Sequence, residues 1–208
     1  MDREKNKINS KLFFVEFRYS SIYDDQCHST FDLLPKQKRS YPNKKVIVAF
    51  MKRLEKEWSK NEQKVFKAIQ KYSGIKWTVK KHVCYVVGSG MPFSDPLTIP
   101  VFAPQAPMDY VSDVLCHELI HRNLIEPAFL ERWNKILAKL KKKFPKNNEN
   151  VLVHVIVHAI HEQIFLSLFS EERLKRDKCI MFVYKDYHKA WEIVEKVGAK
   201  EIINTFLR

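Results

Sequence analysis

One stretch, residues 149–172, constrains the fold of this chain more than any other. It reads ENVLVHVIVHAIHEQIFLSLFSEE and is dominated by aliphatic residues, which predicts one long and largely buried helix. At about 100° per residue, four polar side chains of this helix fall within roughly a quarter turn of one face: His154, His158, His161 and Glu162. Burying imidazoles and a carboxylate together is costly unless they are paired or bind a metal ion. The stretch therefore predicts a core helix with a polar site on one face.

A second group of histidines lies upstream, where residues 117–121 read His-Glu-Leu-Ile-His. On a helix, His117 and His121 lie one turn apart on one face, so both imidazoles can reach a single metal ion. Glu118, beside the first ligand, can take a proton from a water molecule on that metal. Zn2+ fits this set best, because imidazole nitrogens suit a tetrahedral site with one position open for water or substrate. The sequence therefore predicts a Zn2+ cofactor whose third ligand comes from the 149–172 helix.

Length and composition indicate a globular protein. A chain of 208 residues with 45% hydrophobic residues can bury one full core, so we expect a single domain over residues 1–208. The four cysteines form no C-x-x-C pair, which is typical of reduced thiols in a cytoplasmic protein. We see no secretory signal, and the longest apolar stretch reads as too short and too polar to cross a bilayer. We therefore predict a cytoplasmic protein without a membrane partner.

The formal net charge is +13, and most of the basic residues are lysines. Many of them recur at helical spacing between Lys52 and Lys71, which predicts a solvated outer helix face. Lysine is also a weaker choice than arginine for reading bases or gripping phosphates in a bidentate manner. A solvated lysine-rich surface is the favoured interpretation, and weak contact with nucleic acid through it is the alternative.

The order of the predicted elements indicates an α+β fold. We expect a strand over residues 11–20, an irregular connection over 21–43, and a helix over 45–72 that breaks near Ser59 and ends at Gly74. Strands are predicted at 76–80 and 82–87. Residues 97–102 contain a proline inside a β-like run and are predicted to form an edge strand or, as an equal alternative, a surface loop. Helices follow over these residues: 108–123, 128–144, 148–175, 187–197 and 199–207. We therefore predict a small, mostly antiparallel sheet with an edge strand, followed by the metal-binding helix and C-terminal helices.

The motif at His117–His121 resembles that of the zincins, the metallopeptidases defined by H-E-x-x-H. The resemblance covers the motif helix and, loosely, the strand-rich half before it and the helices after it. It departs from the metzincin pattern, because Leu124 stands at the glycine position and Pro127 at the position of the third histidine. It departs from the thermolysin pattern, because residues 139–144 contain no carboxylate. The compact gluzincins, or minigluzincins, and the SprT-like proteases are the most similar groups, and they imply a zincin-like fold.

The same resemblance leaves the third ligand open. In the favoured assignment His158 binds zinc and Glu162 hydrogen-bonds a ligand imidazole, with the acid four residues after the ligand as in gluzincins. Alternatively Glu162 is the ligand, as in a strict gluzincin, and His158 or His161 supports it. His154 and His161 are the remaining candidates for the ligand itself. SprT-like proteases also use a histidine as third ligand, and their action on DNA-bound proteins would suit the basic charge.

As a function, the resemblance implies a zinc-dependent hydrolase of peptide or protein substrates, with Glu118 as general base. Three residues after the histidine-rich helix are candidates for an additional donor to the developing oxyanion: Tyr184, Tyr187 and His188. The alternative class is a basic, nucleic-acid-associated or regulatory binding protein. Its zinc site would be structural, or would be inactive or latent.

Overall fold

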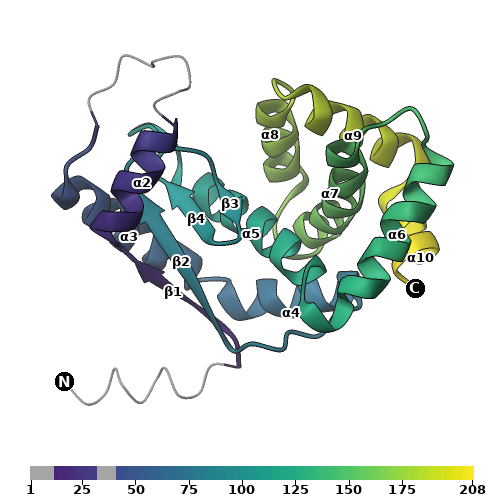
Figure 1. Cartoon of the computed structure of the whole chain (residues 1–208), viewed down its shortest axis with the longest axis horizontal. Helices are drawn as coiled ribbons and strands as arrows, with labels where there is room; N and C mark the ends of the chain where they lie inside the picture. Colours follow the sequence, from purple (N-terminus) through teal and green to yellow (C-terminus); the bar gives the residue numbers. More distant parts are fainter. Residues whose placement is uncertain (1–11, 32–40) are drawn as a thin grey trace. The chain divides into compact units, whose positions relative to one another are not determined.

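The computed structural model describes residues 12–31 and 41–208 (Figure 1). Its architecture is α+β, as expected, with helices predominating over one small sheet. The chain forms two compact units, each built from two separate stretches. The first unit contains the described residues up to Gln63 together with Val79–Leu119, and the second contains Lys64–Thr78 and Ile120–Arg208. A single domain over residues 1–208 stays a prediction.

The first unit contains a four-stranded mixed sheet in the order β1-β2-β4-β3 (Figure 1). Its strands are β1 (Phe14–Arg18), β2 (Lys81–Val87), β3 (Phe93–Ser94) and β4 (Leu97–Pro100). β1 and β4 both run parallel to β2, and only the short β3 runs antiparallel to its neighbour β4. The prediction of a mostly antiparallel sheet is therefore wrong. Helices connect β1 to β2, and such a long crossover returns the chain in the same direction.

The predicted edge strand at 97–102 is also corrected. β4 lies inside the sheet between β2 and β3, and all four of its residues are buried. β3, which precedes β4 in the sequence, forms the edge strand, and the chain then turns back to form β4 beside β2. Pro100 is the last residue of β4, so its missing N–H does not interrupt the ladder. Pro100 therefore marks the end of this strand and not an edge position in the sheet.

The strand predicted over residues 76–80 does not form. Trp77 instead lies against the preceding helix, α4 (Glu62–Ser73), within the second unit. Its backbone N–H donates to Gln70 Oε1 at 2.9 Å, and its indole Nε1 donates to the Phe66 carbonyl at 3.3 Å. The first bond satisfies the backbone donor that a strand would have paired with a neighbour, and the second satisfies the buried indole.

Three helices form in the described part of the chain between β1 and Gly74. Residues 21–31, predicted as irregular, form α2 (Ser21–Phe31), while residues 32–40 of that predicted connection lie outside the described part. α2 is held by Asp24, which accepts from the Gly88 N–H after β2 at 2.7 Å. The predicted long helix is confirmed with its break, as α3 (Lys44–Trp58) followed by α4. Gly74, with φ of +73°, ends α4 as expected.

Glu62 connects α3 to β1 in the first unit, and it yields a stability prediction. Its buried carboxylate accepts from the Val15 N–H at 2.8 Å and from Trp58 Nε1 at 3.1 Å. We expect Glu62→Ala to lower the free energy of unfolding by about 2–4 kcal/mol, because two buried donors lose their acceptor. Urea denaturation measures the change. Glu62→Gln keeps an acceptor oxygen and should lose less; equal losses for the two variants would show that packing, not hydrogen bonding, is responsible.

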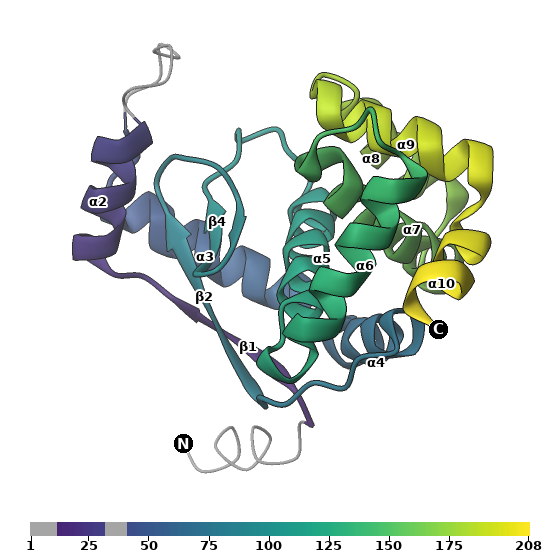
Figure 2. The same cartoon turned by 45° about the vertical axis from the view of Figure 1, so that its right-hand side comes forward.

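In the second unit, α7 (Glu149–Leu168) is the central helix. Four helices contact it (Figure 2): α6 (Leu130–Lys143), α8 (Glu171–Met181), α9 (Lys185–Val197) and α10 (Ala199–Leu207). A short 3-10 turn, η1 (Pro127–Phe129), precedes α6. The prediction of a largely buried helix is confirmed, but the helix ends before residue 175. Ser170 starts α8 there, because its hydroxyl accepts from the Arg173 N–H at 3.2 Å.

By length and composition alone, α7 could cross a membrane, contrary to the sequence interpretation. Of its most apolar window, however, 72% is buried inside the structure. The surrounding helices supply that burial, which is what a core helix of this composition requires. We therefore interpret α7 as a core helix.

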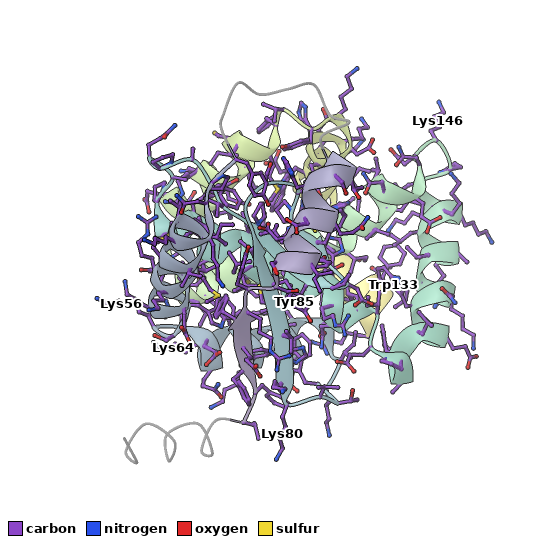
Figure 3. The ribbon with its side chains drawn as sticks, turned by 60° about the vertical axis from the view of Figure 1, so that its left-hand side comes forward. Lys56, Lys64, Lys80, Tyr85, Trp133 and Lys146 are labelled. Atoms are coloured by element: carbon purple, nitrogen blue, oxygen red, sulfur yellow. The ribbon has the colours of Figure 1, made fainter. Side chains whose placement is uncertain are left out.

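The lysines predicted to form a solvated face are all exposed, on the outer sides of α3 and α4. Figure 3 shows Lys56, Lys80 and Lys146 reaching away from the ribbon. The basic end of α6 is exposed as well, at Lys139 and residues 141–143. The solvated lysine-rich surface is confirmed, and contact with nucleic acid stays a prediction.

Candidate metal centre

The motif helix forms as predicted, as α5 (Met108–Leu124). Every residue from Val111 to Ile120 is buried, so the helix is apolar around much of its circumference and lies inside the protein. His117 is buried and His121 is partly buried, one turn later on the same face. The helix therefore presents both imidazoles in the arrangement that the sequence predicts.

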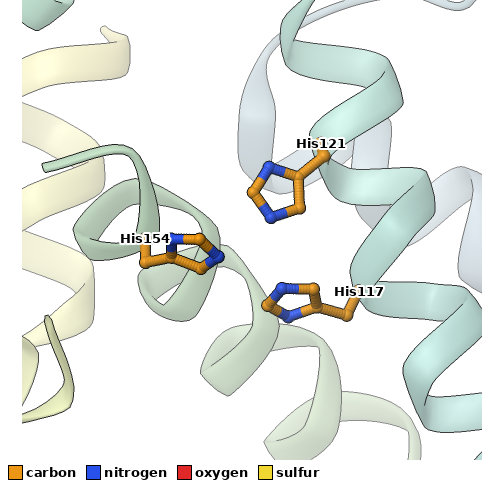
Figure 4. Close-up of side chains that lie close together, drawn as sticks. All are labelled: His117, His121 and His154. Atoms are coloured by element: carbon orange, nitrogen blue, oxygen red, sulfur yellow. The ribbon is translucent and has the colours of Figure 1, made fainter. Parts of the chain in front are cut away.

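His154, on the first half of α7, completes a group of three histidines. One ring nitrogen from each of His117, His121 and His154 lies within 4.8 Å of the other two. Figure 4 shows the three imidazoles, two from α5 and one from α7, pointing toward one another. Zn–N bonds of about 2.0–2.1 Å in a tetrahedron separate nitrogens by about 3.4 Å, so modest ring rotations would close the group around one ion. The arrangement could hold a metal ion.

A hydrogen bond determines which nitrogen His154 offers. Its Nδ1 lies 2.7 Å from the Asn150 carbonyl oxygen, one turn earlier on α7. Because a carbonyl only accepts, Nδ1 carries the proton in this bond, and Nε2 of the neutral ring keeps its lone pair. Metal-binding histidines are commonly oriented in this way by an acceptor on the other ring nitrogen. This hydrogen bond therefore leaves Nε2 of His154 as the nitrogen that could bind a metal ion.

Burial keeps the imidazoles of His121 and His154 neutral. Burial and, as a smaller effect, the neighbouring His154 lower the pKa of His121 to about 3. Burial also lowers the pKa of His154, although its bond to Asn150 opposes the shift. Neutral imidazole is the form that binds metals, since a protonated ring has no lone pair to donate. The electrostatics therefore favour metal binding over protonation near pH 7.

Glu118 is buried as well, with 8% of its surface exposed. Burial raises its pKa to about 8. Burial and, as a smaller effect, the charge of Glu118 raise the pKa of the Cys84 thiol on β2. The Glu118 carboxylate therefore interacts with a residue of the sheet in the first unit. A cation held by the three histidines would favour the ionised carboxylate, because opposite charges stabilise each other.

His158, favoured by the sequence as the third ligand, lies outside the group of three. Its fully buried ring stacks on Trp191 of α9, with centroids 4.3 Å apart and planes at 10°. The ring centroids of His154 and His158 are 5.5 Å apart. The structure therefore accounts for His158 as a core residue between α7 and α9, and the geometry favours His154 as the ligand.

Glu162 and His161 lie further along α7. Glu162 is eight residues after His154, about 12 Å along the helix axis. Its carboxylate lies 3.2 Å from Lys178 Nζ on α8. His161 lies 3.7 Å from the carboxylate of Asp177, also on α8, and both are fully buried. These contacts connect α7 to α8, and the structure does not bring either residue into the histidine group.

Of the three candidate oxyanion donors, Tyr187 lies against the group. Its ring centroid is 4.0 Å from that of His154. Tyr184 contacts Tyr187 at 5.6 Å, whereas His188 lies against Phe182 at 4.2 Å. The start of α9 therefore brings Tyr187 against His154, which was among the less favoured ligand candidates in the sequence.

Comparison with known proteins adds no relative to this picture. No family model matches the chain, and no curated protein or solved structure is significantly similar to it. The zincin resemblance therefore rests on the motif at residues 117–121 and stays a prediction. What the structure supplies independently is the buried group of His117, His121 and His154, which could hold a metal ion.

Proposed function

We propose that this protein is a zinc-dependent peptidase in which His117, His121 and His154 bind Zn2+ and Glu118 is the general base. The observation that carries the proposal is the convergence of ring nitrogens from three histidines, two buried and one partly buried, within 4.8 Å of one another, with a buried glutamate next to the first histidine. Three imidazoles leave one position of a tetrahedral metal open, as hydrolytic zinc sites require. The substrate class is a peptide or protein.

The chain's own residues supply the remaining chemistry. When bound, Zn2+ acts as a Lewis acid and makes a water molecule nucleophilic near neutral pH. Glu118 accepts the proton of the attacking water and passes it to the leaving amine. Tyr187, against His154, is the candidate for an additional donor to the developing oxyanion.

The alternative is a basic binding protein with a structural, inactive or latent zinc site. Structural zinc usually closes with four protein ligands, often cysteines. The nearest cysteine in sequence, Cys116, is about 100° around α5 from His117, a poor position for a fourth ligand.

None of the four cysteines, all in the described part of the chain, forms a disulfide, and on that basis we propose a cytoplasmic location.

The proposal is tested by metal analysis together with peptide hydrolysis. We expect purified protein, prepared without chelators, to contain about one zinc per chain and to cleave members of a mixed peptide library. His117→Ala should lose both properties, because two imidazoles alone bind zinc weakly. His188→Ala, a change on the surface of α9, is the control and should keep the zinc. Metal-free wild-type protein would overturn the metal site; zinc without any hydrolysis would favour the binding-protein alternative.

A further inference from the structure

The first turns of α7 and α9 are joined by one carboxylate, that of Asp186. It accepts from Asn150 Nδ2 at 2.8 Å and from Asn148 Nδ2 at 3.1 Å. Asn148 is the N-cap of α7, since its side-chain oxygen accepts from the Val151 N–H at 2.9 Å. Asp186 therefore holds the residue that starts α7 and a residue in its first turn.

Asn150 connects this carboxylate to the histidine group. Its side chain donates to Asp186, and its backbone carbonyl accepts from His154 Nδ1 at 2.7 Å. The residue after Asp186 is Tyr187, whose ring lies against His154. His154 is thus bounded on one side by the carbonyl of Asn150 and on another by the ring of Tyr187, and Asp186 is adjacent to both.

We propose that Asp186 is a positioning residue for the metal centre, holding the imidazole of His154 through Asn150 and the start of α9. The inference rests on the proposed function, because it assigns a role at the proposed zinc site. Asp186 does not bind the metal. Its effect is to keep Nε2 of His154 directed at His117 and His121, and to place a negative charge near a bound dication.

The charge of Asp186 is secured by the same contacts. Its hydrogen bonds from Asn150, the larger effect, and Asn148 hold the pKa of this carboxyl below its usual value. A negative charge at this place would also stabilise a dication held by the three histidines, so position and charge act in the same direction.

A merely structural role would give a different result. Asp186 also stabilises α9 as an acidic residue in its first turn, and joins two helices at the surface. Loss of these contacts would lower the stability of the metal-free protein without a specific effect on metal affinity. The two roles are therefore distinguished by measuring Zn2+ affinity and metal-free unfolding on the same variants.

The experiment measures Zn2+ affinity of the full chain by competition with a chromogenic chelator. We expect Asp186→Asn to weaken binding by about 10-fold or more, the usual effect of losing a partner that orients a ligand. Asn150→Ala should weaken it comparably, because alanine removes the side chain that Asp186 holds. It is an exposed change to a good helix former, so it also provides a second folded variant. The Zn2+ affinity of the double variant should be at most about threefold lower than that of the single variant that binds less tightly, because both changes interrupt the same series of contacts.

Glu192→Gln is the matched control. It removes the same charge from an exposed site on α9, where Glu192 pairs with Lys189 at 2.7 Å. We expect its Zn2+ affinity to stay within about twofold of wild type. Affinity of Asp186→Asn within twofold of wild type, an equal loss in Glu192→Gln, or fully multiplicative losses in the double variant would each overturn the positioning role. A wild-type protein without Zn2+ affinity would overturn the metal site and this inference together.

Discussion

Replacement of His154 by alanine is expected to remove the bound zinc, whereas replacement of His158 is expected to leave it in place. His154 supplies one of the three ring nitrogens that lie close together, and its loss leaves two imidazoles. His158 stacks on Trp191 and contributes packing. We therefore expect His158→Ala to lower the free energy of unfolding by about 2–4 kcal/mol, as large-to-small core changes do, without abolishing stoichiometric zinc.

Zinc content and urea denaturation on the same preparations separate these effects. Both variants remove an imidazole from α7, so each is the control for the other. Glu162→Gln is the third member of the set and should keep its zinc, because Glu162 pairs with Lys178. Complete zinc loss in His158→Ala with retention in His154→Ala would return the ligand role to His158. Complete loss in Glu162→Gln alone would make the site that of a strict gluzincin.

Replacement of Glu118 by glutamine is expected to abolish most hydrolysis while the zinc remains. Glutamine keeps the size and polarity of the side chain but has no basic oxygen to take the proton of the attacking water. General-base catalysis contributes about 10²–10⁴-fold to rate, so we expect kcat to fall by that factor. Zinc content should be unchanged, because Glu118 is not one of the three ligands.

The measurement uses a peptide that wild-type protein cleaves in a chelator-sensitive manner, with kcat and zinc content determined together. Glu149→Gln, an exposed acid in the first turn of α7, is the matched control and should keep the wild-type rate. Hydrolysis by Glu118→Gln at the wild-type rate would show that another group is the base. Loss of zinc in this variant would instead indicate that Glu118 supports the metal site.

The helices were largely predictable because their signals are local. The break between α3 and α4 and the two C-terminal helices follow from apolar periodicity and helix-ending residues such as Gly74. α2 was missed because its sequence is polar and has no clear apolar face. The strand directions were missed for a different reason: pairing in a sheet joins segments far apart in the chain, as β1 and β2 are.

The histidine site divides in the same way. The spacing of His117 and His121 places both on one face of any helix that contains them, so these two candidate ligands and the adjacent Glu118 could be named from the sequence alone. The 149–172 helix was also predicted as the source of buried histidines. Which of its histidines lies with His117 and His121 could not be predicted, because His158 and Glu162 form a ligand-and-acid spacing as good as any in the sequence. The hydrogen bond that orients His154 uses a backbone carbonyl one turn earlier. Because every position in a helix has such a carbonyl, this feature does not distinguish one histidine of the helix from another.

What the sequence determined by itself is therefore the chemistry of the donors: two imidazoles one turn apart, a carboxylate beside them, and a buried helix rich in histidine. What only the tertiary structure decided is which turn of α7 lies beside His121. That depends on the packing of α7 against α6, α8, α9 and α10, through contacts such as His158 on Trp191 and Glu162 with Lys178. Each successive turn presents nearly the same face, so periodicity along one helix contains no information about its axial position against another.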